Sequence, residues 1–284
     1  MRTPKGRIMI IGGAEEREGR PVPEMAEENE DSVPFSILKE LLPPSQSKKP
    51  VKVFLTALKD PEDAGKTYKE TFSRLGFHNV EIINISSREQ ASDPGLIKDV
   101  VASHAVFFSG GNQFRLTTIL GGTEIASVIE KKYYEDESFI LAGTSAGAMA
   151  MSKVMIYQGQ PKEAMLQGEM RFMSGLGFLD NCIIDTHFVK RSRFGRLTQT
   201  ILQNPTCVGI GLGEDTALVV SKGNVMECIG SGMVIIIDGS QIKYTNILSA
   251  DLDSPLSVEG LVVHILAKGN GYKLREKEYI PEVK

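Results

Sequence analysis

The residues with the clearest chemical signature are a serine between two glycines, in Gly143-Thr144-Ser145-Ala146-Gly147. An apolar run at 139–141 precedes them, and small residues that suit the start of a helix follow. A Gly-x-Ser-x-Gly sequence between a buried strand and a helix is typical of a nucleophile elbow, a sharp turn that raises the serine hydroxyl above the sheet edge. The alternative interpretation is a glycine-rich turn with an incidental serine.

A serine hydroxyl is a weak nucleophile near neutral pH and needs an adjacent base that a third group orients. The chain has four histidines. His78 lies in a polar turn, His104 precedes a strand at the opposite sheet edge, and His264 alternates within a late strand. His187 instead follows the apolar run 182–184, where a strand passes into a helix-compatible segment. We therefore predict His187 as the base, the alternative being a capping or core histidine.

Two acids are candidates for the orienting group. Asp185 lies two residues before His187 and could either orient the imidazole or cap the following helix. Glu214 lies in a glycine-rich loop between two short strands, which could also be a plain hairpin turn. With Glu214 the chain order is Ser, His, Glu, whereas α/β-hydrolases order the triad Ser, acid, His. That order argues against lipase and esterase relatives.

Backbone amides near Ser145 could stabilise the oxyanion of acyl transfer. The amide of Ala146 is expected at a helix N-terminus, where it would point at the developing negative charge. Gly111 and Asn112 follow the apolar run 105–108, so either could supply a second amide from a neighbouring strand end.

The elements that must position these residues follow a regular alternation. Continuously apolar runs occur at 8–11, 51–55, 80–83, 105–108 and 139–141, and they indicate strands buried on both faces of a parallel sheet. Helix-compatible stretches at 35–42, 64–75, 94–102, 115–120 and 123–133 lie between them. The alternation predicts a doubly wound, mostly parallel α/β sheet, with ligands bound outside the carboxyl ends of the strands.

Two regions depart from this alternation. The segment 14–34 is strongly acidic, and we interpret it as a solvated surface insertion, with a lid near the strand edge as the alternative. From about residue 223 the pattern changes to short β-like pieces, which predict an antiparallel addition to the main sheet. We therefore expect residues 1–284 to form a single α/β domain.

Composition and segment lengths indicate which partners and cell compartments to expect. A net charge of −4 with 41% hydrophobic residues gives no reason to expect nucleic acid or an anionic membrane as a partner. The first apolar run is too short for a signal peptide, and no segment is long enough to span a bilayer. Cys182, Cys207 and Cys228 are widely spaced and read as reduced core residues. The sequence predicts a cytoplasmic protein without a metal site or cofactor.

Several segments together resemble those of cyanophycinases. In chain order they are Ile11-Gly12-Gly13-Ala14-Glu15, Phe108-Ser109-Gly110-Gly111-Asn112-Gln113, Gly143-Thr144-Ser145-Ala146-Gly147-Ala148, Asp185-Thr186-His187-Phe188 with Arg191, Arg193 and Arg196, Gly209-Ile210-Gly211-Leu212-Gly213-Glu214-Asp215-Thr216-Ala217, and Ile236-Ile237-Asp238-Gly239. The resemblance covers nearly the whole chain except the acidic segment.

This resemblance implies a serine peptidase related to aspartyl dipeptidases, on a class I glutamine amidotransferase-like (flavodoxin-like) sheet. The implied substrate is cyanophycin, a polyaspartate with arginine on each side-chain carboxyl, which exopeptidase action through an acyl-enzyme cuts into β-Asp-Arg dipeptides. The implied triad is Ser145, His187 and Glu214, in a homodimer without cofactors.

The positions that match the substrate pocket of the family are Gln113, Asp185, Thr186, Arg191, Arg193 and Arg196. Arginines suit the free carboxylates of a β-Asp-Arg unit through forked hydrogen bonds, and Asp185 could receive its guanidinium. The family usually has Gln at the position of Thr186 and Asp at that of Gly213. Because Thr186 removes a long amide, a peptidase for small aspartyl or β-aspartyl peptides is the alternative. A silent binding protein on the same sheet is a third hypothesis, which the intact triad disfavours.

Overall fold

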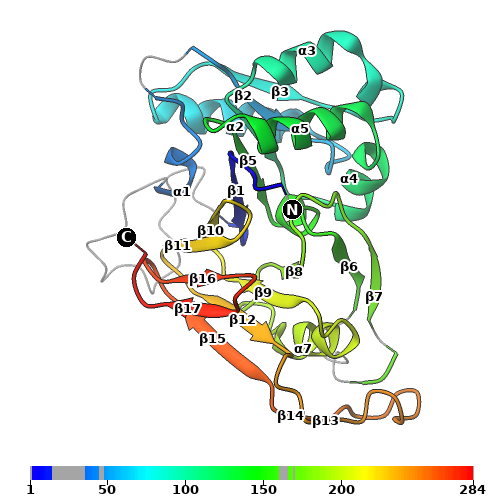
Figure 1. Cartoon of the computed structure of the whole chain (residues 1–284). Helices are drawn as coiled ribbons and strands as arrows, with labels where there is room; N and C mark the ends of the chain where they lie inside the picture. The colour runs from blue at the N-terminus through cyan, green and yellow to red at the C-terminus, as the bar shows by residue number, and fades with distance from the viewer. Residues whose placement is uncertain (1, 15–35, 45–47, 160–165, 169, 284) are drawn as a thin grey trace.

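The computed structural model describes residues 2–14, 36–44, 48–159, 166–168 and 170–283. Residues 15–34 of the acidic segment therefore lie outside the described residues, and so does Phe35 at the start of a predicted helix. Two sheets organise the molecule, with most helices around the parallel strands of the larger one in the upper half of Figure 1 and the second sheet in the lower half.

The parallel half of the larger sheet contains the five predicted strands. They are β1 (Arg7–Ile11), β5 (Ile140–Thr144), β4 (Ala105–Phe108), β2 (Val51–Phe54) and β3 (Val80–Ile83), adjacent in that order and all parallel. Every residue of β2, β4 and β5 is buried. This burial on both faces explains the continuous apolar runs and confirms the predicted mostly parallel sheet.

Helices cover both faces of this sheet. They are α1 (Ser36–Lys39), α2 (Glu62–Arg74), α3 (Pro94–Ala102), α4 (Gln113–Leu120), α5 (Glu124–Glu135) and the short α6 (Ala146–Met149), with a 3-10 turn at Gln90–Ser92. The core of one face takes in side chains of α3, α4 and α5, and that of the other takes in α1 and α2. Ile10 and Ile11, neighbours in β1, belong to opposite cores, as the pleat of a strand requires. The doubly wound arrangement is confirmed.

Antiparallel strands extend the larger sheet beyond β1. They are β10 (Thr216–Ser221), β11 (Val225–Gly230), β16 (Gly271–Lys273) and β17 (Glu278–Ile280), in that order outward from β1. The predicted antiparallel addition is therefore present, and it includes a strand that begins before residue 223.

The second sheet has four strands among the described residues, in the order β15 (Val262–Leu266), β12 (Val234–Asp238), β9 (Val208–Leu212) and β8 (Cys182–Asp185). The sequence predicts that the β-like pieces after residue 223 extend the main sheet. Two of them, β12 and β15, instead pair here, because β12 hydrogen-bonds with β9 and not with β11. A hydrophobic pattern identifies a strand but not the strand it pairs with, so the pairing of β12 could be determined only from the structure.

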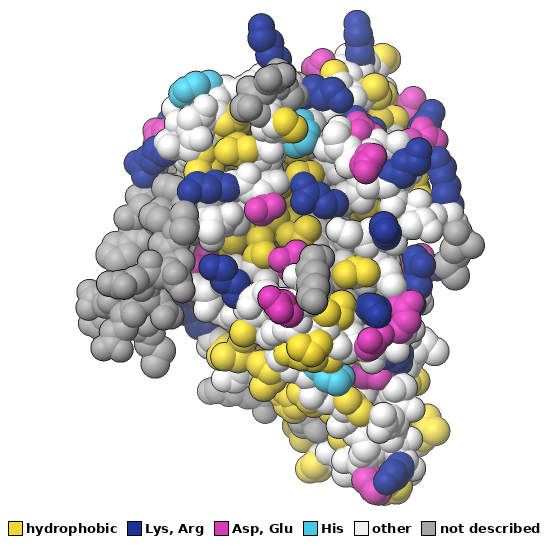
Figure 2. All heavy atoms as spheres, turned by 60° about the vertical axis from the view of Figure 1, so that its left-hand side comes forward, with side chains coloured by type: hydrophobic (Ala, Val, Ile, Leu, Met, Phe, Trp, Pro, Cys, Tyr) yellow, Lys and Arg dark blue, Asp and Glu magenta, His cyan; other side chains and the backbone are white. Residues whose placement is uncertain are grey.

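Smaller elements complete the fold. They are the hairpin of β6 (Val154–Gln158) and β7 (Arg171–Ser174), the pair β13 (Tyr244–Thr245) and β14 (Val258–Glu259), and α7 (Phe194–Gln203) packed against β9. Lysine, arginine and acidic side chains are interspersed over the face of the molecule in Figure 2. Within the described ranges, no helix has the length and apolar character needed to cross a membrane.

Candidate active site

Ser145 lies in the turn that links β5 to α6, at the carboxyl end of the parallel strands. Its backbone has φ 50° and ψ −112°, a combination that a non-glycine residue holds only when its surroundings impose it. A Cβ on Gly143 would lie 2.6 Å from the carbonyl carbon of Gly147, and one on Gly147 would collide with the carbonyl of Phe108. Both glycines are therefore sterically required, and the predicted elbow is confirmed as a backbone conformation.

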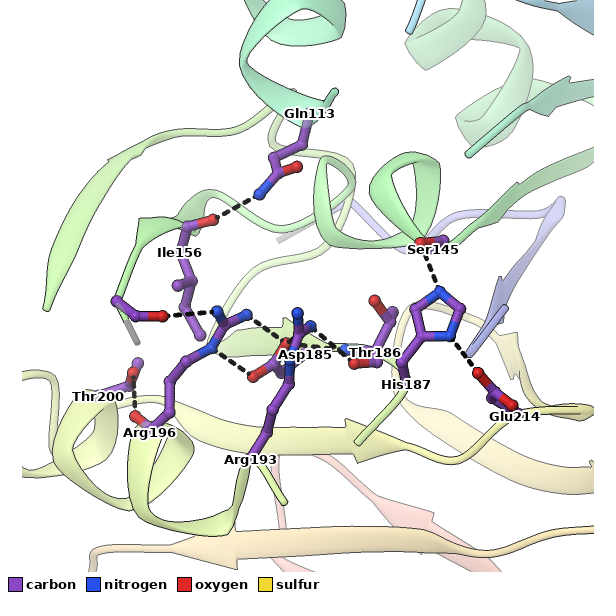
Figure 3. A network of polar contacts seen from close by, with 11 residues as sticks. Gln113, Ser145, Ile156, Asp185, Thr186, His187, Arg193, Arg196, Thr200 and Glu214 are labelled. Atoms are coloured by element: carbon purple, nitrogen blue, oxygen red, sulfur yellow. Dashed lines mark hydrogen bonds and ion pairs between the residues drawn. The ribbon is translucent and has the colours of Figure 1, made fainter. Parts of the chain in front are cut away.

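His187 lies between Ser145 and Glu214, as Figure 3 shows. Its Nε2 is 3.0 Å from Oγ of Ser145, and its Nδ1 is 2.7 Å from Oε1 of Glu214. These contacts are the ones that a base and its orienting acid require. Of the two acids left open by the sequence, Glu214 is therefore the one that contacts the imidazole.

The backbone of the loop after β1 holds the His187 and Glu214 segments together. The carbonyl of Gly12 accepts the amide of His187 at 2.9 Å, and that of Gly13 accepts the amide of Asp215 at 3.0 Å. Glu214 lies where the chain passes from β9 of the second sheet to β10 of the larger one. The two sheets thus meet at the site, and each contributes part of it.

Glu214 also binds Lys190, whose Nζ donates to Oε2 at 2.9 Å. Partial burial raises the pKa of the Glu214 carboxyl, but hydrogen bonds from His187 and Lys190 outweigh that effect and hold the pKa below its ordinary value. Glu214 is therefore ionised at neutral pH and able to stabilise a protonated imidazole.

Three amides were predicted for the oxyanion. Ala146 is the first residue of α6, and a Cβ on Gly110, next to Gly111, would lie 3.5 Å from Cβ of Ser145. The amide of Asn112 donates to the carbonyl of Ala57 at 2.9 Å. Among the described residues, neither Ala146 nor Gly111 has a hydrogen-bond acceptor for its amide. Of the three predicted amides, that of Asn112 is thus engaged within the protein, whereas those of Ala146 and Gly111 are not, among the described residues.

Asp185 is completely buried at the end of β8, where it binds two arginines. Its Oδ1 accepts Nη1 of Arg193 at 2.8 Å and Nη2 of Arg196 at 2.6 Å, and its Oδ2 accepts Nε of Arg196 at 2.8 Å. We call these three residues the Asp185 cluster; Figure 3 shows it beside Thr186 and His187. Burial lowers the pKa of Arg193 in this cluster.

The remaining predicted binding residues differ in their exposure. Arg191 is exposed in the turn after His187, and Thr186 is buried with its carbonyl accepting Nη1 of Arg193 at 2.8 Å. Gln113 begins α4 and is half-buried, with its Nε2 3.4 Å from the carbonyl of Ile156 in β6. The structure thus brings the predicted residues into one region around the triad and leaves their roles toward a substrate as predictions.

Two residues of the site were missed by the sequence analysis. Nζ of Lys190 donates to Oε2 of Glu214. No sequence pattern identifies this lysine, because Glu214 is distant from it in the chain. Gly13 belongs to a motif of the resemblance, but its contact with His187 follows only from the fold. In the described part of the chain no three His, Cys, Asp or Glu residues cluster closely enough to hold a metal ion.

Comparisons with known proteins identify the family of this chain. The model of peptidase family S51 matches residues 27–228. A cyanophycinase from Synechococcus elongatus is 31% identical over 272 residues, covering 95% of this chain and 80% of the relative. A cyanophycinase from Trichormus variabilis is 32% identical over 288 residues, covering 100% of this chain and 91% of the relative.

The fold has a counterpart among solved structures. The crystal structure of a peptidase from an acI-B1 Actinobacterium superposes with a TM-score of 0.66 at 22% identity, covering 96% of this chain and 98% of that one. At that identity the likeness speaks for the fold alone. The family model and the curated relatives each extend over most of the chain, so this protein belongs to peptidase family S51.

Proposed function

We propose that this protein is a serine exopeptidase that hydrolyses cyanophycin to β-Asp-Arg dipeptides through an acyl-enzyme. The observation that carries the proposal is the continuous contact from Oγ of Ser145 to Nε2 of His187 at 3.0 Å and from Nδ1 of His187 to Oε1 of Glu214 at 2.7 Å. The cyanophycinase relatives support the choice of substrate.

The geometry supports the following reaction. Oγ of Ser145 attacks the scissile carbonyl carbon, and its proton passes to Nε2 of His187. Glu214 stabilises the imidazolium through Nδ1. The C–N bond then breaks, and the leaving amine takes the proton from Nε2. Water attacks the acyl-enzyme with His187 again accepting the proton, which then returns to Oγ as the ester breaks.

We assign the oxyanion to the amides of Ala146 and Gly111. Ala146 lies at the first position of α6, and Gly111 follows Gly110, which packs against Ser145. These two N–H groups would hydrogen-bond the oxygen that becomes negative, and such donors are worth roughly 10²- to 10³-fold in kcat each.

For the substrate we assign Arg191, Arg193 and Gln113 as contact residues. Arg191 is exposed beside the triad, and Nε of Arg193 is buried without an acceptor among the described residues. A buried guanidinium nitrogen without a partner is costly, and a substrate carboxylate would satisfy it. The side chain of Gln113 makes only a long hydrogen bond to the carbonyl of Ile156, so it is free to turn toward substrate.

The alternative activity is hydrolysis of small aspartyl or β-aspartyl peptides. The buried Thr186 favours it, because this side chain offers no amide to an arginine-bearing substrate, unlike the Gln that is usual in the resembling family.

Incubation with purified cyanophycin, followed by mass spectrometry of the soluble products, tests the proposal, with Ser145→Ala as the matched control. Release of β-Asp-Arg by the wild type and not by the control is expected. Cleavage of short aspartyl peptides without attack on the polymer would move the function to the alternative, and inertness toward both would contradict both.

We also propose a homodimer located in the cytoplasm. The homodimer rests on the resemblance, and the location rests on the free state of Cys182, Cys207 and Cys228. Light scattering of the purified protein tests the first, and fractionation of the source cells tests the second.

A further inference from the structure

Arg196 uses every nitrogen of its guanidinium within the protein. Nε and Nη2 bind the two oxygens of Asp185 in a forked pair at 2.8 and 2.6 Å, and Nη1 donates to the carbonyl of Gly159 at 3.2 Å. Its side chain is 8% exposed, and that of Asp185 is fully buried. A substrate carboxylate would therefore have to displace contacts that are already formed.

Asp185 in turn holds the backbone that leads to the base. Its Oδ1 accepts the amide of Thr186 at 2.9 Å, and the carbonyl of Thr186 accepts Arg193 at 2.8 Å. Both peptide groups of Thr186 are thus anchored to the Asp185 cluster. The next residue, His187, has φ 49°, a conformation that persists only where neighbouring contacts impose it.

We propose that Arg196 and Asp185 are positioning residues, which act through the Thr186 backbone to keep the His187 imidazole between Ser145 and Glu214, and not ligands for substrate. The proposal rests on the serine mechanism of the proposed function and deepens it.

Electrostatics distinguishes the two arginines of the cluster. The forked pair between Arg196 and Asp185 is buried and geometrically complete, the condition under which a buried ion pair offsets its desolvation cost. Arg193 binds Asp185 through Nη1 alone and leaves its buried Nε without an acceptor among the described residues. Arg196 therefore has a positioning role alone, whereas Arg193 both anchors the Thr186 carbonyl and keeps a buried Nε for an added carboxylate.

The test measures the reactivity of Ser145 toward a reagent that makes no use of the substrate-binding residues. Diisopropyl fluorophosphate is small and neutral: Oγ of Ser145 bonds to phosphorus, fluoride leaves, and the hydroxyl proton goes to His187. The variants are Arg196→Lys and Asp185→Asn, which keep a similar shape. Arg88→Lys is the control, because Arg88, like Arg196, donates to backbone carbonyl oxygen but lies outside the site.

We expect Arg196→Lys and Asp185→Asn each to slow phosphorylation of Ser145 at least tenfold and to lower kcat on a β-Asp-Arg peptide by a similar factor. KM should change less than threefold, and Arg88→Lys should match the wild type. The double variant should lose no more than the worse single variant, because both act on one backbone segment. The low-field proton resonance of the His187–Glu214 hydrogen bond should broaden or shift in both.

Circular dichroism at the assay temperature checks that each variant is folded. If Asp185→Asn fails to fold, the Arg196→Lys variant by itself tests the proposal. A folded Arg196→Lys that is phosphorylated at the wild-type rate and changes only KM would overturn the proposal and make Arg196 a substrate ligand. A wild type inert toward both the reagent and peptides would instead contradict the proposed function itself.

Discussion

The imidazole of His187 occupies the space that a side chain on Gly13 would need. A Cβ on Gly13 would lie 2.5 Å from Nε2 of His187, closer than real Cβ contacts come. Gly13 also has φ 99°, a conformation that L residues rarely adopt. The absence of a side chain at Gly13 thus leaves the space in which the His187 imidazole lies.

Gly13→Ala should therefore displace the imidazole and reduce kcat by about 10²-fold or more, since small misplacements of a catalytic group have effects of that order. Gly269→Ala is the matched control: its φ is 87°, and nothing lies within 4 Å of the added Cβ. The control carries the backbone penalty without the clash. Equal activity of the two variants, measured as kcat per folded protein, would contradict the steric argument.

Ser145→Ala should abolish turnover while leaving the fold intact. Removing a triad member of a serine protease costs roughly 10⁴- to 10⁶-fold in kcat. Loss of the hydroxyl removes only the contact with His187 among the side-chain hydrogen bonds described. The thermal midpoint should stay near the wild-type value, and substantial hydrolysis by a folded Ser145→Ala protein would eliminate the serine mechanism.

Glu214→Gln should keep the shape of the site and lose most activity, because an amide does not stabilise the imidazolium. It should also change stability with pH. The pKa of Glu214 is lowered in the folded state, so its contribution to stability is present above the unfolded value of about 4.3 and disappears as pH falls through the lower folded value. Denaturant unfolding should therefore separate wild type and variant at pH 7 and bring them together in acid. A difference that persists at low pH would mean that the Glu214 charge is not its source.

Lys190→Met should have a small effect. The Lys190 side chain is 65% exposed, so solvent screens its charge, and exposed ion pairs are worth about 0 to 1 kcal/mol. We expect kcat to fall by no more than about fivefold, the rate equivalent of 1 kcal/mol. The wild type should approach the variant as salt is raised. A loss comparable with that of Glu214→Gln would show that the acid depends on Lys190.

Arg193→Lys should impair binding although it keeps the charge, since an ammonium lacks the forked donors of a guanidinium. We expect KM for a β-Asp-Arg peptide to rise about tenfold while reaction with a small neutral ester changes little, because a lysine ammonium can still donate to the Thr186 carbonyl that Arg193 anchors. Asp185→Asn is not a substitute for this test, because it alters the backbone next to His187. Equal effects on both substrates would assign Arg193 to the fold.

Local sequence by itself determined the elbow and the parallel strands. A Gly-x-Ser-x-Gly turn depends on contacts between residues that are close in the chain, and continuous apolar runs report burial on both faces directly. With four histidines and one plausible strand end, the choice of His187 needed no coordinates. The catalytic roles and the substrate contacts remain predictions that the experiments above address.

Contacts between distant segments were decided only by the tertiary structure. The residues alone left both Asp185 and Glu214 as candidates to orient the His187 imidazole. Proximity in the chain favoured Asp185, which does not contact the imidazole. The fold turns Asp185 inward to Arg193 and Arg196, and brings Glu214 to His187 where the two sheets meet. Side-chain direction at a strand end and the pairing of β12 depend on packing across the whole chain, which no local pattern encodes.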